Sequence, residues 1–314
     1  MFNFVLHKED TMLVKTQFSI KDLENLSGVK AHTIRIWEKR YNLLEPDRTD
    51  TNIRQYDLDN LKKLLNVTFL YNEGFKISKI AALNETEISK VVQEQAETKG
   101  EDFALTAFKT AMFDFDHKLF VDTYDKVLKE RSFREVFFEV FIPLLNEIGM
   151  LWQTGTIDPV HERFISELIR QKIILHIEAE QHKPRKNDDF VFVLFLPYEE
   201  IHELGLLYAN YEILRNGFAS VYIGINIPMD NLAHLLKHYD KIKFLSYFTV
   251  KPDQVGVEEY VKQFNKKICK DKAQELWLMG AKVYKMNDKD LPDNVRIIKN
   301  LDNLVSSLQN LRKA

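Results

Sequence analysis

The sequence predicts a multidomain protein: an α-helical winged helix-turn-helix head, a four-helix bundle, and an α/β domain with a doubly wound, five-stranded parallel (Rossmann-like) sheet. Three observations support this prediction. Two short helices joined by a glycine-containing turn lie near the start, a strand-free apolar region follows, and strands alternate with helices in the last third. A chain of 314 residues is also long for a single domain.

The amino-acid composition limits the classes of protein to which the chain can belong. The chain is 45% hydrophobic and 29% charged, and its net charge of −3 means that nucleic-acid binding would depend on a local basic patch. Cys269 is the only cysteine, which excludes an intramolecular disulfide and a cysteine-based zinc site. No apolar run reaches the roughly 18 residues of a membrane helix, and the start does not resemble a signal peptide. We therefore expect a cytoplasmic protein without a membrane partner.

The head is expected over residues 17–85, after a loosely held lead-in. Ser19 is placed to cap a helix that ends at Gly28, and a second helix follows over Ala31–Tyr41. The polar stretch 42–61 contains Pro46 and has no helical pattern, so we expect it to fold back as a wing.

Basic and aromatic side chains are interleaved on the second helix and in the wing. Such side chains neutralise phosphates, read guanine edges and pack on the sugar backbone. From Lys15 to Leu65 there are 10 Lys/Arg against 8 Asp/Glu, so composition alone leaves a surface-charged helical bundle open as an alternative. The candidate DNA-binding residues are Arg35, Trp37, Lys39, Arg40, Tyr41, Arg48 and Arg54.

The amino-acid sequence of this segment resembles the MerR-type winged helix-turn-helix family. The resemblance rests on Thr33–Glu38 (TIRIWE), Leu43–Pro46 (LLEP), Arg48 and Arg54–Tyr56 (RQY). It implies a protein that binds double-stranded, pseudo-palindromic DNA operators as a dimer. Arg35 and the wing arginines would contact DNA, while Ile34, Leu44 and Tyr56 would be structural. Metal-sensing members carry cysteines after a long helix, so the single distant Cys269 argues against that class.

Residues 84–100 are polar and predict a helix that runs into a linker at Lys99-Gly100, our first expected boundary. Residues 101–182 show no strand signal and short connections, which favours an antiparallel four-helix bundle. Pro143 should kink or locally end the third helix. The predicted helices are Phe103–Met112, His117–Lys129, Ser132–Trp152 and Pro159–Gln181.

Two bundle residues are candidates for a site. Glu162 begins the stripe that continues with Ile165, Ile169 and Ile173, so its carboxylate either faces a cavity or complements the helix dipole. Trp152 at the end of the third helix is either a large core residue or part of a binding surface.

The charged stretch 183–189 marks the second expected boundary, and the α/β domain is expected over residues 189–314. Short apolar runs predict strands, and helical spacing between them predicts helices. The strands are Phe190–Leu196, Ala219–Ile225, Phe244–Phe248, Glu275–Met279 and Val295–Lys299. The helices are Leu204–Arg215, Met229–His238, Val255–Lys267, a short one near Lys282–Lys285, and Leu301–Leu311.

Between the first strand and its helix lie Glu200, His202 and Gly205. Ligands of open α/β sheets bind outside the carboxyl ends of the strands, where this segment falls. A neutral imidazole there can ligate a metal while a neighbouring carboxylate orients it. Gly205 would allow close approach of something bulky. The alternative is a surface histidine at a helix start.

This segment, Glu200-x-His202-x-x-Gly205, resembles the Asp-x-His-x-x-Gly signature of the cobalamin-binding module of corrinoid methyltransferases. The resemblance implies that His202 is the lower axial ligand of cobalt. It also implies that Ser246 lies against the dimethylbenzimidazole tail, with Thr249 close by. Gly280 stands where that family usually has two glycines.

With the head added, residues 17–311 resemble the CarH/LitR regulators, which are adenosylcobalamin-dependent photoreceptor repressors. Trp152 and Glu162 match the residues over the upper face of the cobalamin in that family. Arg163 stands where that family has a histidine. His161 precedes Glu162, but one position on a helix turns a side chain by about 100°, so His161 does not simply replace it.

From these observations we expect a DNA-binding repressor that senses a cobalamin. The expected signals are the adenosyl form of the cobalamin and light, and we expect the protein to assemble as a dimer or tetramer on its operator. One alternative is a MerR-type regulator whose B12-like domain has lost cobalamin and senses another ligand or a partner protein. A third hypothesis is a corrinoid shuttle of a methyltransferase. The DNA-binding head argues against it, so we do not expect an enzyme.

Overall fold

The computed structural model describes residues 16–96, 100–185, 187–252, 256–269, 273–284, 286 and 291–313. Of the lead-in expected over residues 1–16, residues 1–15 lie outside them. Lys99 and Lys186 of the two expected linkers and the helix positions Val255 and Lys285 also lie outside. The chain forms two compact units, Met1–Ile169 and Arg170–Ala314. The domain ranges 17–85, 101–182 and 189–314 stay predictions.

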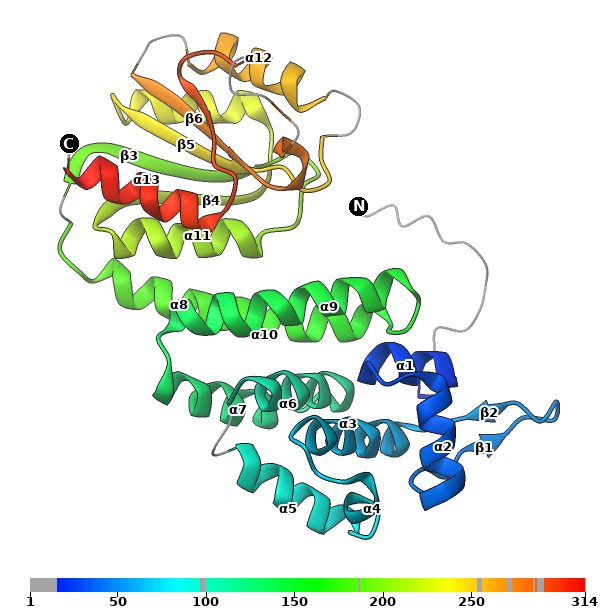
Figure 1. Ribbon diagram of the computed structural model, residues 1–314. Helices are drawn as coiled ribbons and strands as arrows, with labels where there is room; N and C mark the ends of the chain where they lie inside the picture. Colours follow the sequence, from blue (N-terminus) through cyan, green and yellow to red (C-terminus); the bar gives the residue numbers. More distant parts are fainter. Residues whose placement is uncertain are drawn as a thin grey trace. The chain divides into compact units, whose positions relative to one another are not determined.

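The helix-turn-helix and the wing are present in the first unit (Figure 1). A capping box of Ser19 and Asp22 starts α1, and Gly28, with φ 74°, ends it. Tyr56 pairs with Phe18 through two backbone hydrogen bonds of 2.7 and 2.9 Å, which return the wing to the core. The elements are α1 (Ile20–Ser27), α2 (Ala31–Tyr41), β1 (Asp47–Arg48), β2 (Arg54–Gln55), α3 (Leu58–Asn72) and α4 (Ile77–Ile80).

The helices that follow confirm the strand-free region. They are α5 (Glu85–Ala96), α6 (Gly100–Asp114), α7 (His117–Glu130), α8 (Phe133–Glu135), the π-helix η1 (Val136–Phe141), α9 (Ile142–Gln153) and α10 (Pro159–Gln181).

Pro143 does not end the third predicted helix, which is helical without a break from Phe133 to Gln153. Instead, the turn before the proline is a π-helix over Val136–Phe141. Proline has no N–H, and its ring crowds the carbonyl four residues earlier. The wider π turn absorbs that mismatch while the helix continues.

Within the first unit the head packs directly against the helical region. The Phe18 and Phe113 rings meet edge to face, with centroids 5.8 Å apart. The Asn25 amide donates a hydrogen bond of 3.2 Å to the Thr156 hydroxyl, in the turn that follows α9. Buried aromatic contact and polar contact therefore join the head to the helices in one compact body.

The second unit is built on a parallel five-stranded sheet with the order β4-β3-β5-β6-β7, as predicted for a doubly wound domain. Two predicted α-helices are 3₁₀-helices instead: η2 (Met229–Lys237) and η3 (Ala281–Val283). The other elements are β3 (Asn187–Pro197), α11 (Leu204–Arg215), β4 (Phe218–Ile227), β5 (Ile242–Tyr247), α12 (Val257–Lys267), β6 (Gln274–Met279), β7 (Val295–Ile297) and α13 (Leu301–Lys313).

Helices cover both faces of this sheet, with α12 on one face and α11 and α13 on the other (Figure 1). The α12 face holds a core cluster that includes Phe195, Phe244 and Phe264. Strand β3 lies between β4 and β5, so the chain reverses direction across the sheet at this point. In such folds ligands bind at this switch point, outside the carboxyl ends of the two strands.

Gly280 illustrates how tightly the carboxyl edge of the sheet is packed. Its φ is 105°, and a Cβ at this position would lie 2.6 Å from the Phe248 carbonyl oxygen. We expect Gly280→Ala to lower the free energy of unfolding by roughly 2 kcal/mol or more, because alanine is strained at this φ and its Cβ meets rigid backbone.

The matched control is Gly149→Ala, since nothing lies within 4 Å of a Cβ at this position in α9. Alanine there should raise stability by about 0.5–1 kcal/mol through helix propensity. Urea unfolding followed by circular dichroism measures both changes. Equal effects of the two substitutions would contradict the packing argument.

Candidate functional site

The Glu200 carboxylate lies at the switch point and is fully buried. Its Oε2 accepts backbone N–H hydrogen bonds from Thr249, Val250 and Lys251, at 3.1, 2.7 and 2.9 Å. These three residues follow β5, whereas Glu200 follows β3. One carboxylate oxygen therefore holds together the two loops that flank the switch point.

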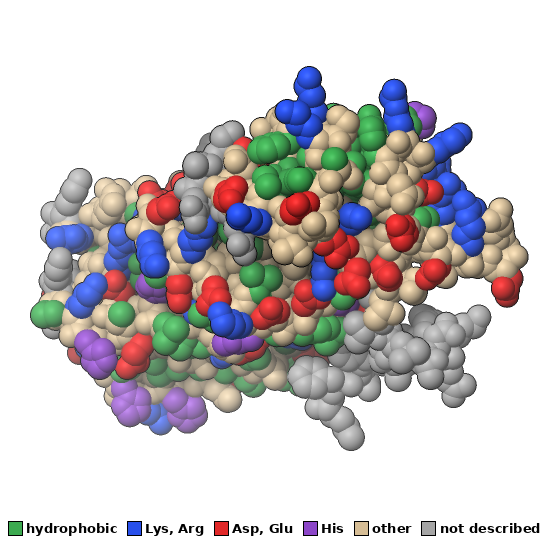
Figure 2. Space-filling model, turned by 90° about the horizontal axis from the view of Figure 1, so that it is seen from below, with side chains coloured by type: hydrophobic (Ala, Val, Ile, Leu, Met, Phe, Trp, Pro, Cys, Tyr) green, Lys and Arg blue, Asp and Glu red, His purple; other side chains and the backbone are tan. Residues whose placement is uncertain are grey.

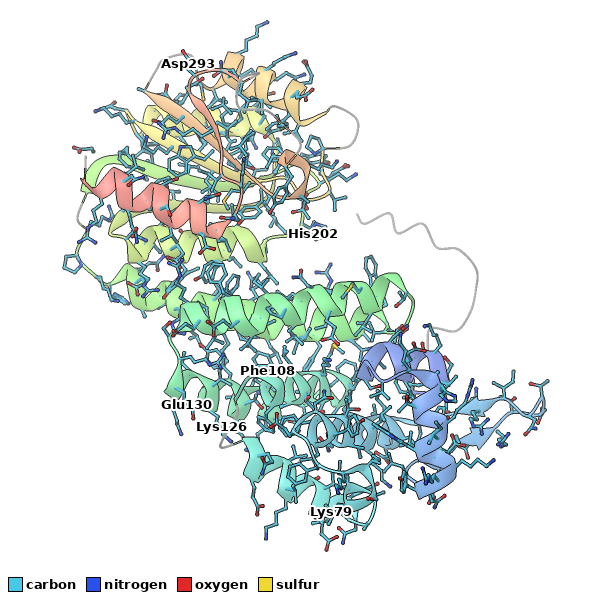
Figure 3. The ribbon with its side chains drawn as sticks, in the orientation of Figure 1. Lys79, Phe108, Lys126, Glu130, His202 and Asp293 are labelled. Atoms are coloured by element: carbon cyan, nitrogen blue, oxygen red, sulfur yellow. The ribbon has the colours of Figure 1, made fainter. Side chains whose placement is uncertain are left out.

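The other oxygen, Oε1, holds His202. It accepts the backbone N–H of Ile201 at 3.0 Å and of His202 at 3.1 Å, and it lies 2.5 Å from His202 Nδ1. A carboxylate partner places the proton on Nδ1, so the lone pair of a neutral ring is on Nε2, as in metal-binding histidines. The His202 side chain is 51% exposed at the sheet edge beside the start of α11 (Figure 3).

Burial alone would raise the pKa of the Glu200 carboxyl. The hydrogen bonds from His202 and from the backbone of Lys251 and Val250 outweigh that effect, so this pKa lies well below its ordinary value. Glu200 is therefore an anion at neutral pH and can orient His202.

Glu203, which follows His202 in the same loop, is also held by hydrogen bonds to other parts of the unit. Its Oε1 accepts a hydrogen bond of 2.7 Å from Arg170 Nε, and its Oε2 accepts one of 3.1 Å from the Tyr222 hydroxyl. Burial, together with Glu203, raises the pKa of the Tyr222 phenol. In the sequence, His202 thus lies between Glu200 and Glu203, and hydrogen bonds hold each of these two carboxylates in place.

The two glycines of the predicted site approach other parts of the chain itself. A Cβ on Gly205 would lie 2.8 Å from the Tyr247 ring, and one on Gly280 would meet the Phe248 backbone. In this structure the bulky group that approaches Gly205 is the Tyr247 ring.

Ser246 and Thr249 lie at and after the end of β5. The Ser246 hydroxyl is fully buried and has no hydrogen-bond partner among the described residues. Such an orphaned polar atom beside the switch point suits a ligand that brings a polar group. Thr249 acts through its backbone N–H, which binds Glu200.

The predicted upper-face residues belong to the first unit. Trp152 is 53% exposed, so it is not the core residue of the alternative reading. Glu162 accepts a hydrogen bond of 2.8 Å from the Ser166 hydroxyl, and Arg163 is exposed. His161 is buried and stacks on Phe115, and burial lowers the pKa of its imidazole. His161 therefore does not replace the histidine expected at position 163.

Six of the seven predicted DNA-binding residues are exposed or half-buried, and Arg54 is one of the half-buried ones. Figure 2 shows Lys and Arg side chains gathered over the part of the first unit that holds α2 and the wing. Arg48 braces the wing turn with a 2.8 Å hydrogen bond to the Asn52 side chain. The exposed residues are Arg35, Lys39, Arg40 and Arg48, and Tyr41 is half-buried.

Trp37 and Arg54 have structural roles. The burial of Trp37 corrects that part of the prediction, whereas a DNA contact of Arg54 stays a prediction. Trp37 is only 4% exposed and packs edge to face on Tyr71, so its indole cannot lie on DNA. Arg54 Nε binds both oxygens of Glu38, at 2.9 and 3.1 Å. Glu38 also accepts the Tyr56 hydroxyl at 2.9 Å, so Arg54 fastens the wing to α2.

Sequence reasoning missed Glu38, Arg170, Glu203, Tyr222 and Tyr247. Their partners are distant in sequence, and single charged or aromatic residues carry no spacing signal.

Within the described residues, no helix has the length and apolar character needed to cross a membrane. The same residues contain no cluster of three His, Cys, Asp or Glu side chains placed for a metal ion.

Comparisons with known family models cover the head and the helical region. Residues 18–86 match the MerR HTH family regulatory protein model, and residues 104–175 match the B12 binding domain model. The chain is 27% identical to the HTH-type transcriptional repressor CarH of Myxococcus xanthus over 257 residues, 78% of this chain and 79% of that protein. It is 26% identical to CarA of the same organism over 211 residues, 67% and 68% of the two chains.

Among solved structures, the Methanosarcina barkeri monomethylamine corrinoid protein aligns with a TM-score of 0.53 and 12% identity, over 65% of this chain and 96% of that one. This likeness concerns the fold. The chain therefore carries a MerR-type head and a B12-binding module.

Glu200 should give a characteristic pH dependence. We expect Glu200→Gln to lower the free energy of unfolding by about 2–3 kcal/mol at neutral pH, because charged hydrogen bonds are lost. The folded-state pKa is depressed, so the stabilisation is fully present above the unfolded-state pKa of about 4.3 and disappears as pH falls toward the folded-state pKa.

The stability gap between wild type and variant should therefore shrink on acidification. Urea unfolding across the acid range measures it, with Glu258→Gln, an exposed carboxylate on α12, as the control. A gap that is constant with pH would show that Glu200 is not held as an anion.

Arg35 is the exposed arginine in the middle of α2. If it reads a base, Arg35→Ala should weaken binding to a duplex selected from a random library by about 1–3 kcal/mol. Fluorescence anisotropy measures the affinity, and Arg312→Ala, exposed on α13, is the control. Unchanged affinity of the Arg35 variant would refute the assignment of α2 as the recognition helix.

Proposed function

We propose that this MerR-type regulator with a B12-binding module is a transcriptional repressor that binds adenosylcobalamin through His202 and responds to light. The DNA-binding and B12-sensing character follows from the two matched families and from relatives named as repressors. The adenosyl form, the ligating residue, repression and light are the parts that we propose.

The observation that carries the proposal is the contact between Glu200 and His202. It holds the imidazole at the switch point with Nδ1 engaged and the other nitrogen as the lone-pair donor. Metal-ligating histidines commonly donate their other ring N–H to a carboxylate, as His202 does to Glu200. The buried, unpartnered Ser246 hydroxyl beside it also fits a ligand with polar groups.

Bound adenosylcobalamin would supply a cobalt–carbon bond that light breaks. The residues proposed for the protein side are Glu200, His202, Gly205, Ser246, Thr249 and Gly280 at the lower site, and Trp152 and Glu162 on the helical region. On the DNA side, the proposed contacts remain Arg35, Lys39, Arg40, Tyr41, Arg48 and Arg54.

Regulation would then be a coupling free energy between the B12 site and the DNA site, with two assembly states of the protein, dimer or tetramer, on a pseudo-palindromic operator. We further propose that the protein acts as a binding regulator in the cytoplasm without catalytic turnover, as the repressor names of its relatives suggest.

The second candidate is a MerR-type regulator that has lost cobalamin and responds to another ligand or a partner protein. Two observations favour it. Arg163 takes the position of an expected histidine, and the Tyr247 ring covers Gly205.

A visible spectrum separates the two candidates. Full-length protein is mixed with adenosylcobalamin in the dark and desalted, beside His202→Ala and the control His234→Ala, an exposed histidine of η2. We expect a retained corrinoid spectrum that is altered or lost only in His202→Ala, because only that ring is held by Glu200. Colourless wild-type protein would favour the second candidate.

Green light tests the proposed signal. After illumination of the loaded protein, we expect affinity for the selected duplex to fall at least about tenfold, which corresponds to about 1.4 kcal/mol of coupling. Unchanged affinity with a retained corrinoid would remove light from the proposal and leave B12 sensing in place.

A further inference from the structure

Ile36 is a large apolar side chain that α2, the second helix of the helix-turn-helix, leaves in contact with water. It is 41% exposed, whereas Ile34 and Trp37 of the same helix belong to the core of the head. The structure describes every residue of α2, and no other large hydrophobic side chain of this helix is exposed. The core therefore does not hold Ile36, and its side chain is available for a contact outside the unit.

The neighbours of Ile36 on the surface of α2 are mostly basic. Residues three and four positions apart are neighbours on a helix, so Lys39 and Arg40 lie beside Ile36 one turn later, and His32 lies one turn earlier. With about 100° of rotation per residue, Ile36 falls between Lys39 and Arg40 around the helix axis. All three neighbours are exposed. Ile36 is thus an apolar position within a cationic face.

This charge indicates what covers Ile36. A single exposed isoleucine is ordinary on a protein surface. Here, however, the surrounding cations complement the phosphates of a duplex, and the second helix of a helix-turn-helix lies in the major groove. The occupant that fits both the charge and the fold is therefore double-stranded DNA, and Ile36 would face the floor of the major groove.

The major groove offers an apolar partner at thymine, whose C5 methyl group projects there beside hydrogen-bond donors and acceptors of the other bases. An isoleucine side chain neither donates nor accepts a hydrogen bond, so this methyl is the group that it can recognise. Isoleucine is also stiff at χ1 in a helix, so little rotamer freedom is lost when it packs.

We propose that Ile36 is a specificity-determining residue that packs on the C5 methyl of one thymine in each half-site of the operator. The cations around it bind phosphates, which position the helix without reading the sequence. Ile36 adds a preference for thymine at one base pair. This inference rests on the DNA-binding part of the proposed function and is independent of the B12 site.

Uracil tests the contact because it lacks only this methyl and pairs with adenine as thymine does. In the duplex selected from a random library, each thymine is replaced in turn by uracil, and fluorescence anisotropy measures the affinity of the full-length protein. At one thymine of the half-site we expect wild-type binding to weaken about fourfold, because one buried methyl contact is lost.

Ile36→Ala should remove this dependence, so that its affinities for the thymine and uracil duplexes agree within about 1.5-fold. Alanine is a good helix former and Ile36 is exposed, so this variant should fold. Ile36→Val keeps a branched apolar side chain and should keep most of the difference between the duplexes.

Two matched controls separate reading of the methyl from a general loss of affinity. Lys39→Ala, one turn away on the same face, should weaken binding to both duplexes equally and retain the thymine preference. Ile53→Ala removes an exposed isoleucine from the wing and should also retain it.

A uracil penalty that is present in wild type and both controls but absent in Ile36→Ala supports the proposal. An equal penalty in Ile36→Ala and wild type, or no penalty at any thymine, overturns it and leaves DNA binding intact. If the wild type enriches no duplex from the library, DNA binding fails and this inference fails with it.

Discussion

The buried Glu200 carboxylate is the constraint on which the second unit's candidate site depends. Three backbone N–H groups of the loop after β5 converge on one oxygen, and the His202 imidazole binds the other. A buried charge is costly unless it is fully hydrogen-bonded, and here both oxygens are satisfied. The same contacts that make the anion tolerable therefore fix the two loops at the switch point and the orientation of the histidine.

Glu38 has the corresponding role in the head. Arg54 and Tyr56 both bind its carboxylate, so the wing is tied to α2, the helix that carries Arg35 and Lys39. The sequence pattern of arginines in the helix and the wing does not show which arginines bind DNA phosphates and which form ion pairs within the head. The pairing with Glu38 gives Arg54 a structural role, and the exposed residues of α2 stay proposed contacts to DNA.

Contacts within the first unit also suggest how a signal could reach the head. The turn after α9, which follows the exposed Trp152, is hydrogen-bonded to α1 through Thr156 and Asn25, and Phe113 joins Phe18 of the wing bridge to the buried His161. Movement of this turn would strain contacts of the head directly. Coupling between a ligand and DNA needs such an element with two arrangements.

The element order, the sheet class and the position of the Glu200-x-His202 segment could be predicted from the amino-acid sequence, because apolar periodicity, capping residues and glycine stops are local signals. The burial of Trp37, the pairing of Arg54 and the contact of the Tyr247 ring with Gly205 could not be predicted in this way. Each of them depends on a partner that folding brings close from a distant part of the chain. The π-helix before Pro143 could be predicted only in part. The proline indicates that the helix is distorted, but the form of the distortion depends on the packing of the continuous helix.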